Sequence, residues 1–187
     1  MIIIGITGTL GAGKGTVVDY LVKNKNFKHF SARGLLIEEI EKRGLENNRD
    51  SMVMVANDLR KKFGPGYIAE ELFKRACESN DSAVIESLRT VGEIEILRKK
   101  GSFTLLAINA DPKIRYERIS IRGSTTDNIS FEKFLADEQR EMESIDPNKQ
   151  NLSECIKRAD FVINNNGSMD ELSEKIEKIL QIITNKK

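Results

Sequence analysis

The feature that most constrains the fold is a glycine-rich segment, residues 8–16, between an apolar run and an amphipathic segment. The run, residues 2–6, is short and rich in isoleucine, which is typical of a strand buried on both faces of a parallel sheet. Residues 15–23 then place apolar side chains on one helical stripe. The order of strand, loop and helix predicts an α/β fold with the loop at the carboxyl end of the first strand.

The loop also has the glycine and lysine spacing of a phosphate-binding loop. Glycines permit torsions that turn successive N–H groups towards one anion, and the following helix contributes its positive end. A strand-to-helix turn without a ligand is the alternative interpretation, but Lys14 and the context favour binding of the ATP triphosphate. The predicted nucleotide ligands in the loop are Gly8, Leu10, Gly11, Ala12, Gly13, Lys14, Gly15 and Thr16.

The rest of the chain alternates apolar runs with amphipathic segments. This alternation predicts a three-layer α/β/α fold with a five-stranded parallel sheet and right-handed crossovers. Asp50 and Ser130 are the expected N-caps of two helices. Four further strands are expected at residues 27–31, 83–86, 103–110 and 161–163, and helices at 35–43, 52–62, 67–77, 93–100, 112–122, 131–144, 152–158 and 170–183.

Composition narrows the class of protein. The 187 residues suit one domain, and 30 Lys plus Arg against 29 Asp plus Glu give a net charge of +1, so no global field favours nucleic acid or a membrane surface. Cys77 and Cys155 have no partners at zinc-ligand spacing, which fits a reducing cytoplasm. The apolar opening is too short for a membrane span. We therefore expect a cytoplasmic monomer or homodimer that binds small molecules.

The Gly-Lys-Gly-Thr form of the loop at residues 13–16 is similar to that of adenylate kinases, and later motifs follow in the order of the nucleoside monophosphate kinase family. Residues 29–35 resemble the segment that opens the monophosphate-binding helix in that family. The resemblance implies an acceptor-binding insertion at about residues 31–80, with Ser31, Arg33 and Arg60 as substrate ligands. Leu36 stands where the family places a phosphate-binding arginine, and Arg60 could also be a solvated helix charge.

Residues 82–90 resemble the kinase strand that ends in an acid and is soon followed by an arginine. The resemblance implies that Glu86 and Arg89 contact the acceptor, and that Thr16 and Glu86 hold Mg²⁺. Arginine in that place can neutralise the transferring phosphoryl group. A simple ion pair between Glu86 and Arg89 is the alternative interpretation.

Arg115, Arg118 and Arg122 look like the arginines of a helical lid at about residues 118–150. The resemblance gives Arg118 and Arg122 catalytic roles beside Lys14 and Arg89, with Arg118 also contacting the nucleotide. An ion pair of these arginines with the neighbouring Glu117 is the alternative. Residues 159–167 resemble the adenine-binding loop of dephospho-coenzyme A kinases, which implies nucleotide contacts by Asn164, Asn166 and Gly167.

These resemblances together imply transfer of the γ-phosphoryl group from ATP, with Mg²⁺, to a nucleoside or deoxynucleoside monophosphate. Two other functions remain open on the sequence. One is dephospho-coenzyme A kinase, whose acceptor is a hydroxyl group. The other is a nucleotide-dependent switch or assembly ATPase, which would act on a protein or RNA partner.

Overall fold

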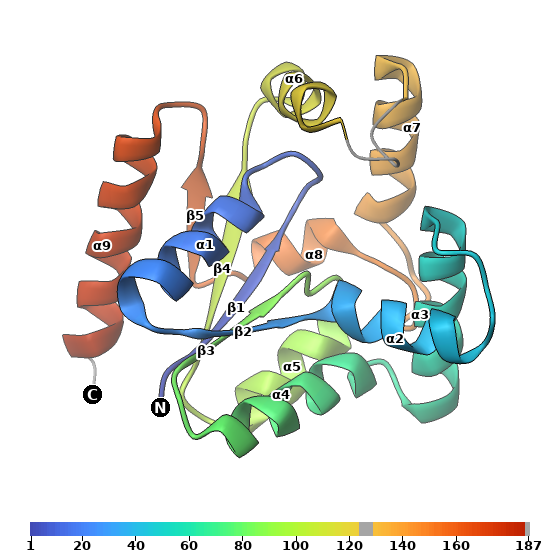
Figure 1. The fold of residues 1–187 in the computed structure, drawn as a ribbon, viewed down its shortest axis with the longest axis horizontal. Helices are drawn as coiled ribbons and strands as arrows, with labels where there is room; N and C mark the ends of the chain where they lie inside the picture. Colours follow the sequence, from blue (N-terminus) through green and yellow to red (C-terminus); the bar gives the residue numbers. More distant parts are fainter. Residues whose placement is uncertain (124–128, 186–187) are drawn as a thin grey trace.

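A computed structural model describes residues 1–123 and 129–185. Its centre is a five-stranded sheet of order β2-β3-β1-β4-β5, in which every pairing is parallel (Figure 1). The predicted α/β class and five-stranded parallel sheet are therefore confirmed. The strands are β1 (Ile3–Gly8), β2 (Lys28–Ser31), β3 (Ala83–Glu86), β4 (Phe103–Asn109) and β5 (Phe161–Asn164).

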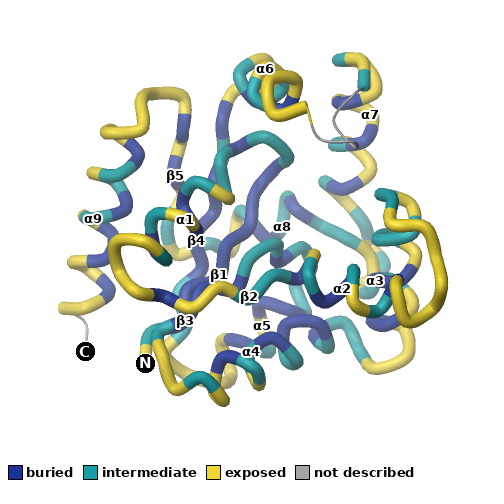
Figure 2. The backbone as a smooth tube through the Cα atoms, viewed as in Figure 1, coloured by how far each residue is buried: buried dark blue, intermediate teal, exposed yellow. Residues whose placement is uncertain are grey.

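Strand β1 lies in the middle of the sheet and is buried along its whole length, as its apolar run predicts. Neighbouring residues enter different cores, since Ile3 joins one apolar cluster and Ile4 joins the other. The first cluster lies under α4 (Tyr67–Ser79), α5 (Val91–Lys99) and α8 (Leu152–Lys157), and the second lies under α1 (Lys14–Lys25) and α9 (Met169–Asn185). Helices thus cover both faces, and Figure 2 shows the buried strands between them.

The predicted insertion contains three consecutive helices. They are α2 (Ala32–Lys42), α3 (Arg49–Phe63) and α4, which together form a lobe beside β2 (Figure 1). The prediction that Asp50 caps α3 is wrong, because Asn48 is the N-cap and its Oδ1 accepts a hydrogen bond from the backbone N–H of Ser51 at 2.9 Å. Asp50 lies in the first helical turn instead, where its charge still favours the helix dipole.

The region expected to form a lid contains α6 (Pro112–Arg122) and α7 (Phe131–Met142). Ser130 caps α7 as predicted, since its Oγ accepts a hydrogen bond from the N–H of Lys133 at 3.2 Å. The expected helix to residue 144 ends at Met142, and bends and turns lead from there to α8. Part of the predicted lid, residues 124–128, lies outside the described residues. Among those that are described, no helix is long and apolar enough to cross a membrane.

Candidate functional site

The phosphate loop connects β1 to α1 and approaches its neighbours so closely that three of its positions exclude a side chain. Gly11 and Gly13 have φ angles of 77° and 96°, a region that favours glycine. A Cβ on Gly11 would lie 2.4 Å from the carbonyl oxygen of Arg115, and a Cβ on Gly8 would lie 2.0 Å from that of Ile108. Strand β4 and helix α6 therefore fix the curvature of the loop.

Lys14 at the start of α1 folds back over this loop. Its Nζ donates hydrogen bonds to the carbonyl oxygens of Gly8 at 2.9 Å and Thr9 at 2.8 Å. Burial, and then the positive charge of Arg89, lower the pKa of Lys14 from 10.5 to about 7. An ammonium group in this environment lacks a full counter-charge, so a phosphate anion placed beside it is strongly favoured.

The loop that follows β5 holds the phosphate loop from the side. The Nδ2 of Asn165 donates to the carbonyl oxygen of Ala12 at 2.9 Å, and the backbone N–H of Asn165 donates to Asn109 at 2.7 Å. Asn165 is buried although it lies in a polar run. It was missed as a site residue because three consecutive asparagines give no sign in the sequence of which one points inward.

The surface of the phosphate loop opens into a cavity of about 450 Å³, which we call the donor cavity. Arg118 and Arg122 of α6 form its other wall, so the structure brings both predicted lid arginines to the loop. The Nη1 of Arg118 is buried without a hydrogen-bond partner among the described residues. The donor cavity is lined by Leu10, Gly11, Gly13, Lys14, Gly15, Thr16, Glu86, Arg118, Ile119 and Arg122.

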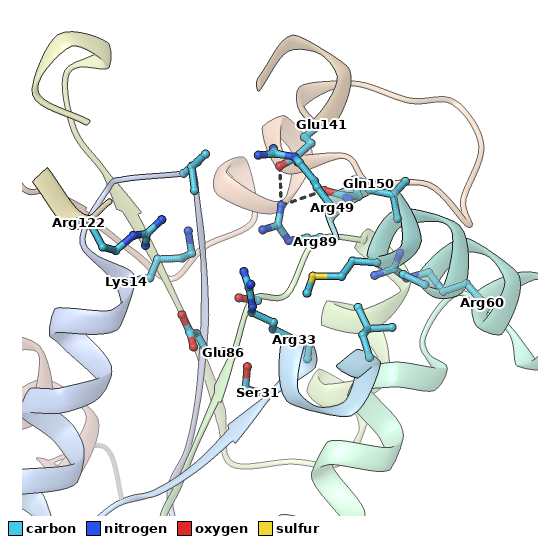
Figure 3. A pocket seen from close by; sticks show the side chains of 17 residues that line it. Lys14, Ser31, Arg33, Arg49, Arg60, Glu86, Arg89, Arg122, Glu141 and Gln150 are labelled. Carbon is cyan, nitrogen blue, oxygen red and sulfur yellow. Dashed lines mark hydrogen bonds and ion pairs between the residues drawn. The ribbon is translucent and has the colours of Figure 1, made fainter. Parts of the chain in front are cut away.

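A second cavity of about 230 Å³, the acceptor cavity, lies between the loop, α2 and α3 (Figure 3). It shares Leu10, Lys14, Glu86 and Arg122 with the donor cavity, so the two spaces meet at these side chains. All five residues predicted to bind the acceptor lie in its wall. The lining residues are Leu10, Lys14, Ser31, Ala32, Arg33, Leu36, Arg49, Met52, Val53, Ala56, Arg60, Glu86, Ser87, Arg89, Arg122, Glu141 and Gln150.

Glu86 ends β3 at the junction of the two cavities. Its Oε2 lies 3.1 Å from Nε2 of His29 on the neighbouring strand. Burial opposes its ionisation, but the hydrogen bond with His29 and the charge of Lys14 outweigh burial and hold the pKa of Glu86 below its ordinary value. The carboxylate and the Thr16 hydroxyl both line the donor cavity. This oxygen pair suits Mg²⁺, which binds through one or two protein groups together with phosphate oxygens.

Arg89 takes part in an ionic bridge that the sequence did not suggest. Its Nη1 contacts Oε2 of Glu141 at 2.5 Å and Oε1 of Gln150 at 2.9 Å, and the other oxygen of Glu141 pairs with Arg49 (Figure 3). The charges of Arg89 and Arg49 overcome the effect of burial and lower the pKa of Glu141. Arg89 thus has partners other than Glu86. Arg49 and Glu141 were missed because they lie about 90 residues apart in segments that read as solvated helix faces.

Two other arginines have buried ion pairs. Arg60 is only 2 % exposed, so the interpretation as a solvated charge is wrong; its Nη2 contacts Oε1 of Glu93 at 2.8 Å. Arg115 pairs with Glu138 on α7 and not with Glu117, and it also donates to the carbonyl oxygen of Leu10 at 3.2 Å. Arg115 therefore connects α7 to the phosphate loop.

Among the remaining predicted ligands, Ser31 is the N-cap of α2 and Arg33 is exposed on its first turn, both beside the acceptor cavity. Asn164, Asn166 and Gly167 line neither cavity. The Oδ1 of Asn166 accepts a hydrogen bond from the backbone N–H of Asp111 at 2.8 Å, which joins the β5 loop to α6. Their contact with a nucleotide base stays a prediction.

Comparisons with known proteins agree with this architecture. A family model described as an AAA domain matches residues 4–146. A UPF0200 protein of Methanocaldococcus jannaschii is 31 % identical over 99 % of this chain and 92 % of its own. A shikimate kinase from Acinetobacter baumannii in complex with shikimate has a TM-score of 0.61 and 16 % identity, over 100 % of this chain and 95 % of its own.

A gluconokinase from Sinorhizobium meliloti 1021 shares the fold as well, with a TM-score of 0.59 and 12 % identity over 98 % of this chain and 94 % of its own. At these identities the two solved structures establish a kinase-like fold and nothing about the acceptor. The comparisons therefore establish a P-loop kinase-like fold, and membership of the nucleoside monophosphate kinases stays a prediction. The chain belongs to the AAA-domain family of P-loop proteins and to the UPF0200 family.

Proposed function

We propose that the protein transfers the γ-phosphoryl group of magnesium-ATP to a nucleoside or deoxynucleoside monophosphate. The observation that carries this proposal is the meeting of the donor and acceptor cavities at Lys14, Glu86 and Arg122. A phosphoryl group leaving the phosphate loop would pass this junction. Direct transfer needs donor and acceptor oxygens on opposite sides of one phosphorus atom, and two adjoining cavities provide that geometry.

The charges of the acceptor cavity favour an anionic acceptor. Six cationic side chains line it, against two carboxylates, Glu86 and Glu141. Those cations come from the phosphate loop, the insertion, the loop after β3 and the lid, so several elements contribute positive charge to the cavity. The cationic residues are Lys14, Arg33, Arg49, Arg60, Arg89 and Arg122.

A phosphate acceptor also simplifies the chemistry that the side chains must perform. Its oxygen is already anionic, so positioning and charge stabilisation suffice and no protein base is required. Lys14, Arg89 and Arg122 would stabilise the charge on the transferring group. Thr16 and Glu86 would hold Mg²⁺, which would neutralise the phosphates when bound.

The test is a product analysis with magnesium-ATP and each common ribo- and deoxynucleoside monophosphate, with dephospho-coenzyme A, shikimate and gluconate as separate acceptors. We expect a nucleoside diphosphate from at least one monophosphate. We expect Arg89→Ala to lower turnover by about a hundredfold, because its charge acts on the transition state. Lys14→Ala controls for contaminating kinases.

The other outcomes separate the rivals. A phosphorylated hydroxyl acceptor would replace this proposal, and phosphorylated dephospho-coenzyme A would identify the first alternative. Slow release of ADP with every acceptor would favour the switch ATPase, because a switch needs hydrolysis and a partner but no small acceptor.

A further inference from the structure

The guanidinium group of Arg60 has one donor that the protein leaves unused. Its Nη1 is buried and has no hydrogen-bond partner among the described residues, although Arg60 lines the acceptor cavity. A guanidinium stays charged and only donates hydrogen bonds, so an unused buried nitrogen is costly. A ligand that supplies an acceptor atom at this place would remove that cost.

The position of this donor is fixed from behind. Oε1 of Glu93 accepts hydrogen bonds from Nε of Arg60 at 3.1 Å and from Nη2 at 2.8 Å. The other oxygen, Oε2, accepts from the backbone N–H groups of Arg89 at 2.7 Å and Thr90 at 3.1 Å, and Glu93 is fully buried. The carboxylate therefore has little freedom to turn, and it holds the guanidinium by Nε and Nη2, so that Nη1 is the one nitrogen that Glu93 does not contact.

The surroundings of Arg60 differ from those of the other cavity cations. Helix α3 lines the cavity with one stripe at helical spacing, residues 49, 52, 53, 56 and 60, whose middle is Met52, Val53 and Ala56. Arg49 and Arg60 stand at its two ends, about 16 Å apart along the helix axis. Figure 3 shows Arg60 across the cavity from Lys14, with Arg33 and Arg89 between them.

An occupant that fits this cavity has a phosphate at the Lys14 side, a flat apolar body against the stripe, and a hydrogen-bond acceptor at the far edge. A nucleoside monophosphate has this form, and the bases differ in the group at that edge. At that edge uracil, thymine and guanine carry a carbonyl oxygen, whereas adenine and cytosine carry an amino group that would face Arg60 donor to donor.

We infer that Arg60 selects the acceptor base, and that it favours a nucleotide whose base carries a carbonyl oxygen at its outer edge, namely uracil, thymine or guanine, over an adenine nucleotide. This inference rests on the proposed nucleotide acceptor. Arg60 is then a ligand of the acceptor base, which it contacts through Nη1, and not a ligand of the acceptor phosphate. Glu93 is then a positioning residue, because it acts only through Arg60.

The test is equilibrium binding of UMP, CMP, GMP and AMP by calorimetry, with the donor cavity filled by magnesium-ADP. We expect UMP or GMP to bind about tenfold more tightly than AMP, a difference of about 1.4 kcal/mol. In Arg60→Lys the cation can still pair with Glu93, but the fork that presents Nη1 is lost. The preference should fall below about threefold there.

The matched control is Arg75→Lys, the same change at an arginine that pairs with Glu38 away from both cavities. It should keep the full preference. Equal binding of AMP in the unmodified protein, or a preference that survives Arg60→Lys, would overturn the inference. The quantity compared in each protein is the ratio of two dissociation constants. An unfolded fraction reduces the amount of binding protein for both ligands alike, so it does not change this ratio.

A substrate-side comparison covers the case in which Arg60→Lys fails to fold. Inosine monophosphate has the carbonyl oxygen at the six-position, and purine ribonucleoside monophosphate lacks it, so the unmodified protein should bind the first about tenfold more tightly. Equal binding of this pair would contradict base reading by Arg60. Binding with base preference but without turnover would leave this inference standing and defeat the proposed kinase activity; no binding at all would defeat both.

Discussion

The donor and acceptor sides of the site are held together by different forces. The phosphate loop is fixed by close backbone contacts and by the amide of Asn165, which donates to Ala12. The acceptor cavity is fixed by ion pairs that join separate elements, such as Glu141 with Arg49 and Arg89. The donor side is therefore formed before any ligand binds. The acceptor side instead contains arginines that can exchange their carboxylate partner for an anionic ligand.

The largest expected effect is that of Lys14→Ala on turnover. Loss of the ammonium group removes charge at the junction of the cavities, so we expect turnover to fall at least about a thousandfold. We expect no fall in the melting temperature, because burial of the ammonium group opposes its charge and lowers the pKa of Lys14 in the free protein. Lys23→Ala, at an exposed position of the same helix, is the control. A loss smaller than tenfold would remove Lys14 from the mechanism.

Gly13→Ala breaks the donor side through its backbone. Alanine disfavours a φ of 96°, and its Cβ would lie 2.3 Å from Nδ2 of Asn165. We expect a loss of about 2 kcal/mol in the free energy of unfolding, measured by urea denaturation, and much weaker ATP binding. Gly15→Ala has no atom within 4 Å of the new Cβ, so it should be nearly neutral for stability. Equal losses in both variants would contradict the preformed loop.

Glu141→Gln tests whether the ion pairs on the acceptor side compete with ligand binding. The carboxylate pairs with two cavity arginines, so it competes with an anionic acceptor for them. The neutral amide should lower the acceptor KM about fivefold, because two cations are freed at little structural cost. Glu138→Gln, which alters the pair with Arg115, should leave this KM unchanged. A raised KM in Glu141→Gln would show instead that the carboxylate orients the arginines for the ligand.

The smallest effect is a proton taken up when ATP binds. With a pKa of about 7, Lys14 is mostly neutral at pH 8, and a triphosphate beside it should restore the charge, with uptake of about 0.9 proton. Calorimetry in buffers of different ionisation enthalpy measures this number, which should fall to near zero in Lys14→Ala.

The lowered pKa of Lys14 also determines how the free energy of unfolding changes with pH. Between pH 7 and 9 Lys14 binds fewer protons in the folded protein than in the unfolded chain, so the stability of the ligand-free protein should rise with pH across this range; above pH 9 the thiol of Cys155, whose pKa burial raises to about 12, opposes this rise. A fall would contradict the assigned shift.

The sequence predicted the position of the phosphate loop, but not Asn165 beside it and not the contacts that hold the acceptor side. The loop is a continuous segment whose glycines and lysine act through local geometry, so the motif alone predicted Lys14 beside the loop. Helix limits were also predictable within a few residues, except where Asn48 displaced Asp50 as the cap, since both residue types cap helices well.

The acceptor side depends on contacts between distant segments. Arg60 reads as a solvated charge until its partner, 33 residues later, is seen to be buried with it. The bridge through Glu141 spans 52 residues to Arg89 and 92 to Arg49, and nothing local marks these residues. Ion pairs of this kind depend on how the helices of the lobe and the lid pack together. The hydrophobic periodicity of the sequence does not determine this packing.

The hydrogen bond from the side chain of Asn165 to Ala12 has a consequence for synthesis of the chain. The phosphate loop lies within the first 16 residues, yet the side chain that holds it from the side comes 153 residues after Ala12. A ribosome-bound chain from which Asn165 has not yet emerged lacks this hydrogen bond, so it should fail to retain ATP. Nucleotide binding would then begin only after β5 has joined the sheet, so retention of ATP would report that the five-stranded sheet is complete.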